Sequence, residues 1–331
     1  MPQMFELNSI QNKTDTVEGL IVKAIDYLNK YSTDIPKLFT DSNGCDAHLC
    51  LVQIISHYEI NFQTFVAKGF EVFLSNLMLY FYEIRNDLNL EKNNNIKKSD
   101  LEFNKKRVLI LANSLYMKNL IFRRSKQFCI EFVHKQGLKP YISFLKDQKF
   151  MQKYRDTQIV DFSNDPYGFL DYVVLNLSSL SLKTADELKQ EWNDLDSVNT
   201  FLNVVKVKES LLSDAYMAIA YILDDKQIES LTEIHLIADL LSLSLKTCAT
   251  NFVNNIFKRA KRQVTFKGKP IDCQVQVYTS ADNVDTSIIV LMESLYRLSV
   301  NDRLKNDIYF KNEMKNCFES FLIKGRIFKN D

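Results

Sequence analysis

Glycine and proline are scarce in this chain. Average usage over 331 residues would give about 23 glycines and about 17 prolines, whereas the sequence has 7 and 5. No two glycines lie closer together than Gly44 and Gly69, so the sequence holds no Walker loop, no G-x-G-x-x-G fingerprint and no G-x-S-x-G elbow. The enzyme classes that hold a phosphate or a nucleophilic serine on such loops therefore lose their main sequence support.

The chain also lacks an excess of charge of either sign and any long apolar run. Lys and Arg number 42 against 41 acids, which gives no general attraction to nucleic acid or membranes. The most apolar stretch, Phe70 to Ile84, is short for a membrane span and contains Glu71 and Glu83. The first ten residues lack the basic start and apolar core of a secretory signal. We expect a cytoplasmic protein, with the nucleus as the alternative, whose six cysteines are reduced thiols.

Apolar residues recur at helical spacing along most of the chain. The spacing predicts helices over Val17–Leu28 and Phe70–Phe81, among others. A hydroxyl and a carboxylate three residues apart form a capping box, which predicts a helix start. Three such pairs precede apolar-periodic runs: Ser99 with Glu102, Thr184 with Glu187, and Ser230 with Glu233. Loops are expected at residues 40–44, 89–98 and 163–166, where the periodicity is lost.

One segment departs from the helical pattern. Between Val264 and Ser280 apolar and polar residues alternate on both sides of a turn at Gly268 to Pro270. This alternation predicts a short β-hairpin or an extended excursion. Because too few other strand candidates exist to build a sheet, we interpret the segment as an insertion between helices.

A unit of two or three helices recurs along the sequence in degenerate copies. Its first helix ends in a Phe-Val pair, polar residues and a glycine, at residues 65–69 in one copy and 132–137 in another. A second helix follows each glycine at once, and a third, longer helix closes the unit. The third helices carry small and apolar residues at 109–115, 173–178, 218–222 and 295–299. A period near 40 to 47 residues with this content is typical of helical repeat arrays, whose units bury their apolar faces against one another.

These turns and helix endings resemble the armadillo-repeat family. The resemblance implies an all-α fold, an armadillo-like α-solenoid in a right-handed superhelix with a small extended or β-hairpin insertion. We expect an N-terminal capping helix and loop at residues 1–44, about five repeats over 45–325 with insertions at 89–98 and 264–280, and a truncated C-terminal end at 326–331. The segment 302–323 supplies the first two helices of a unit without its third, so we expect further sequence beyond Asp331.

The family's peptide-binding device is a ladder of Trp and Asn, four residues apart on each third helix, and this chain departs from it. The single tryptophan, Trp192, falls on a predicted first helix instead. The resemblance to nuclear-import adaptors is therefore limited to the fold. Carried over by position, the candidates for a partner-binding groove are Asn113, Tyr172, Asn176, Tyr221, Glu293 and Arg297. Ordinary surface exposure or packing within a repeat is the alternative for each of them.

A basic patch follows the apolar helix predicted over residues 252–257. It consists of Lys258, Arg259, Lys261, Arg262, Lys267 and Lys269. A nuclear-targeting signal or a contact with nucleic acid is one interpretation. A solvated helix end, where cations meet the negative end of the helix dipole, is the other. The acidic stretch 184–196 carries five acids against Lys189 and is interpreted as an exposed helix.

Metal-binding and catalytic sets are weakly represented. Zinc needs four converging N or S ligands, and on a helix Cys45 and His48 share a face from which Cys50 points away. We interpret these side chains, with His57, as core packing. Histidine is the usual general base, but none of the four histidines lies beside a strained turn that could present a nucleophile. Acid pairs at 194/196 and 224/225 are expected to cap helices. We expect no cofactor, metal or small-molecule substrate.

The sequence therefore favours a non-catalytic scaffold that binds a peptide or protein in the groove of a solenoid, without contact to membranes. The first alternative is a regulatory array of a larger signalling protein, such as one with a Toll/interleukin-receptor NAD-cleaving domain beyond residue 331. A weaker alternative is nucleic-acid binding through the basic patch. The partner's identity and the oligomeric state are left open.

Overall fold

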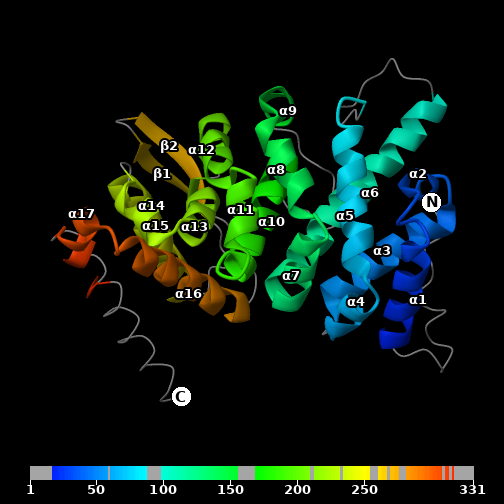
Figure 1. Ribbon diagram of the computed structural model, residues 1–331, viewed down its shortest axis with the longest axis horizontal. Helices are drawn as coiled ribbons and strands as arrows, with labels where there is room; N and C mark the ends of the chain where they lie inside the picture. The colour runs from blue at the N-terminus through cyan, green and yellow to red at the C-terminus, as the bar shows by residue number, and fades with distance from the viewer. Residues whose placement is uncertain are drawn as a thin grey trace. The chain divides into compact units, whose positions relative to one another are not determined.

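The computed structural model describes residues 17–58, 60–87, 98–155, 168–208, 212–231, 234–253, 260–266, 269–275, 281–307, 310–312 and 315–316. This part of the chain is predominantly helical, as the sequence predicts, and carries one pair of strands (Figure 1). It divides into two compact units, an N-terminal unit ending at Glu191 and a C-terminal unit starting at Trp192. None of the described helices combines the length and hydropathy needed to cross a bilayer.

The N-terminal unit holds ten helices within the described residues. In chain order they are α1 (Val17–Asn29), α2 (Ile35–Leu38), α3 (Ser42–His57), α4 (Gln63–Ala67), α5 (Phe70–Glu83), α6 (Lys98–Arg124), α7 (Lys126–His134), α8 (Leu138–Lys146), α9 (Gln148–Tyr154) and α10 (Phe169–Thr184). The helices predicted at 17–28 and 70–81 are confirmed as α1 and α5. A further short helix, α11 (Lys189–Asp194), crosses the boundary between the units and carries the buried Trp192.

Helices of the N-terminal unit pack in rows. Helix α6 packs against both α3 and α10, α5 packs against α8, and α4 packs against α7. Helices α4 and α7 are predicted first helices, α5 and α8 predicted second helices, and α6 and α10 predicted third helices. The core between the rows is rich in aromatic rings, with Phe65 and Phe128 edge to face at 6.5 Å and Phe122 and Phe132 at 5.0 Å between ring centres. Burial of rings of this size dominates the stabilisation of such a core.

The C-terminal unit holds the remaining elements: α12 (Ser197–Val207), α13 (Leu212–Ile222), α14 (Asp225–Glu229), α15 (Ile234–Val253), β1 (Ala260–Phe266), β2 (Lys269–Val275), α16 (Ala281–Leu298) and α17 (Asp302–Lys305). Helix α13 packs against α12, α15 and α16, and α15 also packs against α16. The strands form an antiparallel hairpin in which Val264 pairs with Ile271. The predicted hairpin is confirmed, but it begins at Ala260 and its strands end at Val275.

Several predicted helix boundaries are wrong. Thr184 is the last residue of α10, not a cap before a helix, and its hydroxyl donates to the Leu180 carbonyl at 2.8 Å. Ser230 follows the end of α14 and donates to the Gln227 carbonyl at 3.0 Å. In both cases the hydroxyl donates to a carbonyl of the helix that ends at this point. Such local bonds of Ser and Thr compete with capping of a following helix. Helix α6 already begins at Lys98, one residue before Ser99.

Carboxylates cap several helices. Asp224 caps α14 in a capping box with Gln227, as expected for this acid pair. Asp196 stands at the start of α12 in a left-handed conformation, and its side chain makes no cap hydrogen bond there. The loop expected at 40–44 is shorter than predicted, because Asp41 accepts a hydrogen bond from the Asn43 backbone and α3 begins at Ser42. Of the loop expected at 89–98, Lys98 already belongs to α6, and residues 89–97 lie outside the described residues, as does the loop expected at 163–166.

Candidate functional site

The six groove candidates divide into a buried group of four and a pair on α16, of which Glu293 is exposed and Arg297 is partly buried. Asn113 on α6, Tyr172 and Asn176 on α10, and Tyr221 on α13 are buried. The side-chain amide of Asn176 donates to the Leu115 carbonyl at 3.0 Å and to the Tyr141 hydroxyl at 3.2 Å. For these four side chains, burial favours the alternative of packing within a repeat. Glu293 and Arg297 lie on α16, and nearly half of the Glu293 side chain is exposed.

Glu293 and Arg297 belong to a continuous surface on α16 and the turn that follows it. Glu293, Tyr296, Arg297 and Val300 recur at helical spacing, and we call them the α16 face. The Tyr296 residue is 76% exposed, the largest value among the exposed large hydrophobic residues that the structure describes. A ring with this exposure contributes little to the stability of the fold, because most of its apolar area stays in contact with water.

Packing and charge hold the α16 face in place. The Arg297 guanidinium lies over the Tyr221 ring, 4.3 Å from its centre, and 3.6 Å from Glu293 Oε1. Leu295 and Leu298 are buried on the other side of the helix. Just beyond the helix, the Asn301 amide donates to the Ile228 carbonyl at 2.7 Å and to the Glu229 carbonyl at 3.1 Å. These bonds tie the end of α16 to α14.

A second notable site is a buried polar cluster inside the N-terminal unit. It consists of His48 from α3, Ser114 and Lys118 from α6, Tyr141 from α8 and Asn176 from α10, and we call it the basic cluster. His48 Nε2 and Ser114 Oγ lie 2.9 Å apart and share a hydrogen bond. The Lys118 ammonium nitrogen lies 5.5 Å from the centre of the Tyr141 ring. Within this cluster, His48 Nδ1, Lys118 Nζ and Asn176 Oδ1 have no hydrogen-bond partner among the described residues.

Burial controls the protonation of the basic cluster. It lowers the pKa of His48 to about 3, and the nearby Lys118 adds to this effect. It also lowers the pKa of Lys118 well below its ordinary value. The pKa of Tyr141 is raised well above its usual value, again chiefly by burial. A low-dielectric interior disfavours the charged form of each group, so burial favours the neutral form of all three.

Sequence reasoning missed Lys118, although a signal was present. Leu111, Leu115, Lys118 and Phe122 follow one another at spacings of four, three and four residues. This spacing places position 118 within the apolar stripe of its helix. A lysine in such a stripe is unusual, because lysine is almost never fully buried unless it is paired.

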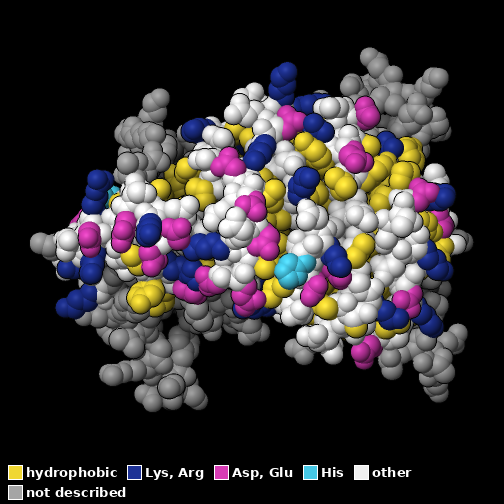
Figure 2. Space-filling view, in the orientation of Figure 1, with side chains coloured by type: hydrophobic (Ala, Val, Ile, Leu, Met, Phe, Trp, Pro, Cys, Tyr) yellow, Lys and Arg dark blue, Asp and Glu magenta, His cyan; other side chains and the backbone are white. Residues whose placement is uncertain are grey.

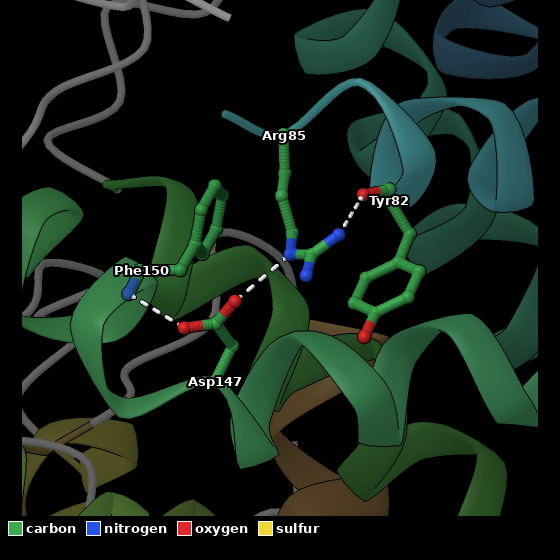
Figure 3. A network of polar contacts seen from close by, with 4 residues as sticks. All are labelled: Tyr82, Arg85, Asp147 and Phe150. Carbon is green, nitrogen blue, oxygen red and sulfur yellow. Dashed lines mark hydrogen bonds and ion pairs between the residues drawn. The ribbon is translucent and has the colours of Figure 1, made fainter. Parts of the chain in front are cut away.

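Another polar network joins α5 to α9 (Figure 3). Arg85 Nε donates to Asp147 Oδ2 at 2.8 Å, and its Nη1 donates to the Tyr82 carbonyl at 2.9 Å. The other oxygen of Asp147 accepts from the Phe150 backbone at 3.0 Å and so caps α9. The Arg85 guanidinium lowers the pKa of the Asp147 carboxyl. Since both carboxylate oxygens are used within the protein, we assign this network a structural role.

On the face shown in Figure 2, hydrophobic side chains gather over the region where α2, α5 and α6 lie in Figure 1. Aromatic residues of α5, of α6 and of the end of α2 contact one another. The Phe39 ring stacks on Tyr80 at 5.4 Å and meets Phe103 edge to face at 6.2 Å. The Arg107 guanidinium covers the Phe103 ring at 4.2 Å. These rings act as partners for each other, which is a packing role.

The described residues contain no group of three or more His, Cys, Asp or Glu side chains placed to hold a metal ion. On α3, Cys45 directs its thiol to the Leu38 carbonyl at 3.4 Å, and burial raises the pKa of both Cys45 and Cys50. His48 turns to Ser114 instead. The side chain of His57 lies outside the described residues. So do the side chains of the basic patch, Lys258, Arg259, Lys261, Arg262, Lys267 and Lys269.

Comparison of the chain with protein-family models, with curated proteins and with solved structures finds no match.

Proposed function

We propose that the protein is a non-catalytic helical scaffold that binds a polypeptide partner through the α16 face. The observation that carries this proposal is the exposure of Tyr296 beside a charge pair that is fixed by packing. Tyrosine and arginine are the residue types enriched where binding energy concentrates in protein interfaces. A rigid surface also loses little side-chain freedom when a partner docks.

The chemistry of the α16 face favours a polypeptide over a nucleic acid. Glu293 places a negative charge within the surface, and a phosphate backbone would be repelled by it. A polypeptide can place an apolar side chain on the Tyr296 ring and a polar group beside the Glu293–Arg297 pair. Partner binding at this face also removes the exposed ring area from water.

The proposed architecture is an armadillo-like α-solenoid in a right-handed superhelix. Support comes from the packing of predicted third helices against each other, α6 against α10 in the N-terminal unit and α13 against α16 in the C-terminal unit. In such arrays each unit contacts only its neighbours and presents an extended surface for binding. The α16 face would lie on the third helix of the last complete repeat.

Substitution of exposed tyrosines tests the proposal. Partners of the full chain are first captured by a photo-crosslinking residue placed at position 296, and the affinity of the captured polypeptide is then measured. We expect Tyr296→Ala to weaken binding about tenfold or more, the loss typical of an interface anchor. The matched control is Tyr58→Ala, which removes another exposed tyrosine, 45% exposed, from the N-terminal unit. Equal affinity of the two variants would contradict the assignment of the α16 face.

A further inference from the structure

We propose that His48 and Lys118 form a proton-operated release inside the N-terminal unit, in which proton uptake drives apart the helices packed around the basic cluster. This inference is independent of the proposed partner binding. It depends on the position of the two bases, which come from neighbouring helices and are both fully buried. They are close enough for the charge of one to act on the other.

Four helices meet at the basic cluster, and none of their described side chains supplies a carboxylate to it. Helix α3 contributes His48, α8 contributes Tyr141 and α10 contributes the neutral Asn176. Burial is the cause of the lowered pKa of Lys118, without a charged neighbour that would offset it. A positive charge at this place would therefore stay unpaired in a low-dielectric interior, a state that costs several kcal/mol.

Other buried titratable groups on the helices packed against α6 have contacts of their own. Asp171 on α10 accepts a hydrogen bond from the Gly168 backbone N–H at 2.7 Å. Glu71 on α5 interacts with Glu131 and Lys135. Cys129 on α7 interacts with Lys183, and its thiol donates to the Phe122 carbonyl at 3.3 Å. None of these groups contributes to the pKa shifts of Lys118 and His48. Among the described groups, the basic cluster is thus a pair of bases without an acidic partner.

Proton linkage gives the direction of the effect. The pKa of His48 is lowered from 6.5 to about 3 in the packed state. Between these values an opened chain binds a proton that the packed chain excludes, so opening becomes about tenfold more favourable for each pH unit lost. Lys118 acts in the same sense, starting at the ordinary pKa of lysine and continuing down to its own lowered pKa. Stability contributed by both groups is full at alkaline pH and is lost as the pH falls.

Packing alone gives no reason for a lysine at position 118. A methionine fills a similar volume in a core and carries no proton. Replacement of a buried charged group by an apolar one of similar volume is often neutral or stabilising. The lysine therefore adds a dependence on pH to a site that would be tighter without it.

Hydrogen exchange of the full chain tests this proposal. Protection factors of the α6 amides, corrected for intrinsic exchange rates, are measured from pH 4.5 to pH 9.5. In the wild-type chain we expect protection to fall about tenfold for each pH unit from pH 9.5 down to the lowered pKa of Lys118, and His48 should add a further factor of about ten per unit below pH 6.5. Lys118→Met should remove the alkaline part of this dependence, and His48→Gln the acidic part. The control Lys106→Met removes an exposed lysine from the same helix and should keep the wild-type dependence.

A second measurement keeps the proposal testable if a variant fails to fold. Selective ¹³C labelling of lysine gives an ε-methylene signal for each lysine, and the signal missing from Lys118→Met identifies Lys118. We expect this signal to change from the charged to the neutral amine at a lower pH than the signals of the other lysines. A Lys118 that titrates together with the exposed lysines, or a Lys118→Met variant with the full alkaline dependence of the wild type, would overturn the proposal.

Discussion

The two turns that carry the repeat pattern use glycine for different reasons. After α4, Gly69 has a φ of +63°, and a Cβ added there would meet no described atom closer than Glu71 Oε1 at 3.9 Å. After α7, Gly137 has an ordinary φ of −63°, but an added Cβ would lie 2.4 Å from the Phe132 ring. One glycine supplies a backbone conformation and the other supplies space.

The geometry of the turns corrects the way in which their sequences align. The left-handed residue follows the C-cap in both turns, and it is Gly69 after Lys68 in the first and Gln136 after Lys135 in the second. Gly137 is the residue after that. Its backbone N–H donates to the Phe132 carbonyl at 2.9 Å, while that of Gln136 donates to Val133. These bonds form a Schellman motif, which brings position 137 against residue 132.

Gly137→Ala should have the largest effect among the turn substitutions. The Phe132 ring that blocks the new methyl group is fully buried and packs against Phe122 at 5.0 Å and Tyr141 at 6.3 Å, so it cannot move away freely. We expect a loss of about 3 kcal/mol in the free energy of unfolding, at the upper end for overpacking. Urea denaturation followed by circular dichroism measures it. A loss below about 1 kcal/mol would show that the core yields.

Gly69→Ala should have a smaller effect, because only the backbone conformation opposes the side chain. A left-handed conformation costs an L-residue roughly 1 to 2 kcal/mol, and the reduced freedom of the unfolded chain returns part of this. We expect a net loss of about 1 kcal/mol, measured as above. Gly69→Asn is the matched control and should lose less, since asparagine tolerates this conformation. A loss as large as that of Gly137→Ala would end the distinction between the two turns.

The helices could be predicted from the sequence, because each has an apolar stripe that must be buried. Periodicity is a local property, and α1 and α5 follow it within two residues of the predicted ends. Helix ends were harder to predict. Thr184 and Ser230 have the capping pattern in sequence, but their hydroxyls bond to carbonyls of the preceding helix. Whether the hydroxyl caps a following helix or bonds to a carbonyl of its own helix end depends on the path of the chain after that residue, which the local sequence pattern does not specify.

The candidate sites were less predictable than the helices. Asn113 and Asn176 were aligned with a peptide-binding ladder, and burial of both depends on neighbouring helices that no local pattern specifies. Tyr296 lies on the α16 face beside the two groove candidates of that helix. Residue type alone did not distinguish this exposed tyrosine from the tyrosines that are buried in the core. The position of Lys118 in an apolar stripe can be recognised in the sequence. The absence of an acidic partner among the described residues depends on the tertiary structure and could not be predicted.

Gln136→Gly should have the smallest effect and the opposite sign. Gln136 has a φ of +64°, a region in which glycine has no steric penalty. The greater freedom of glycine in the unfolded chain offsets part of the gain, so we expect a stabilisation of about 0.5 kcal/mol. Lys135→Gly, one residue earlier at a φ of −83°, relieves nothing and should destabilise the protein. If both substitutions lowered the free energy of unfolding equally, the left-handed residue would not be the one that sets this turn, and the alignment on Gly69 and Gln136 would fail with it.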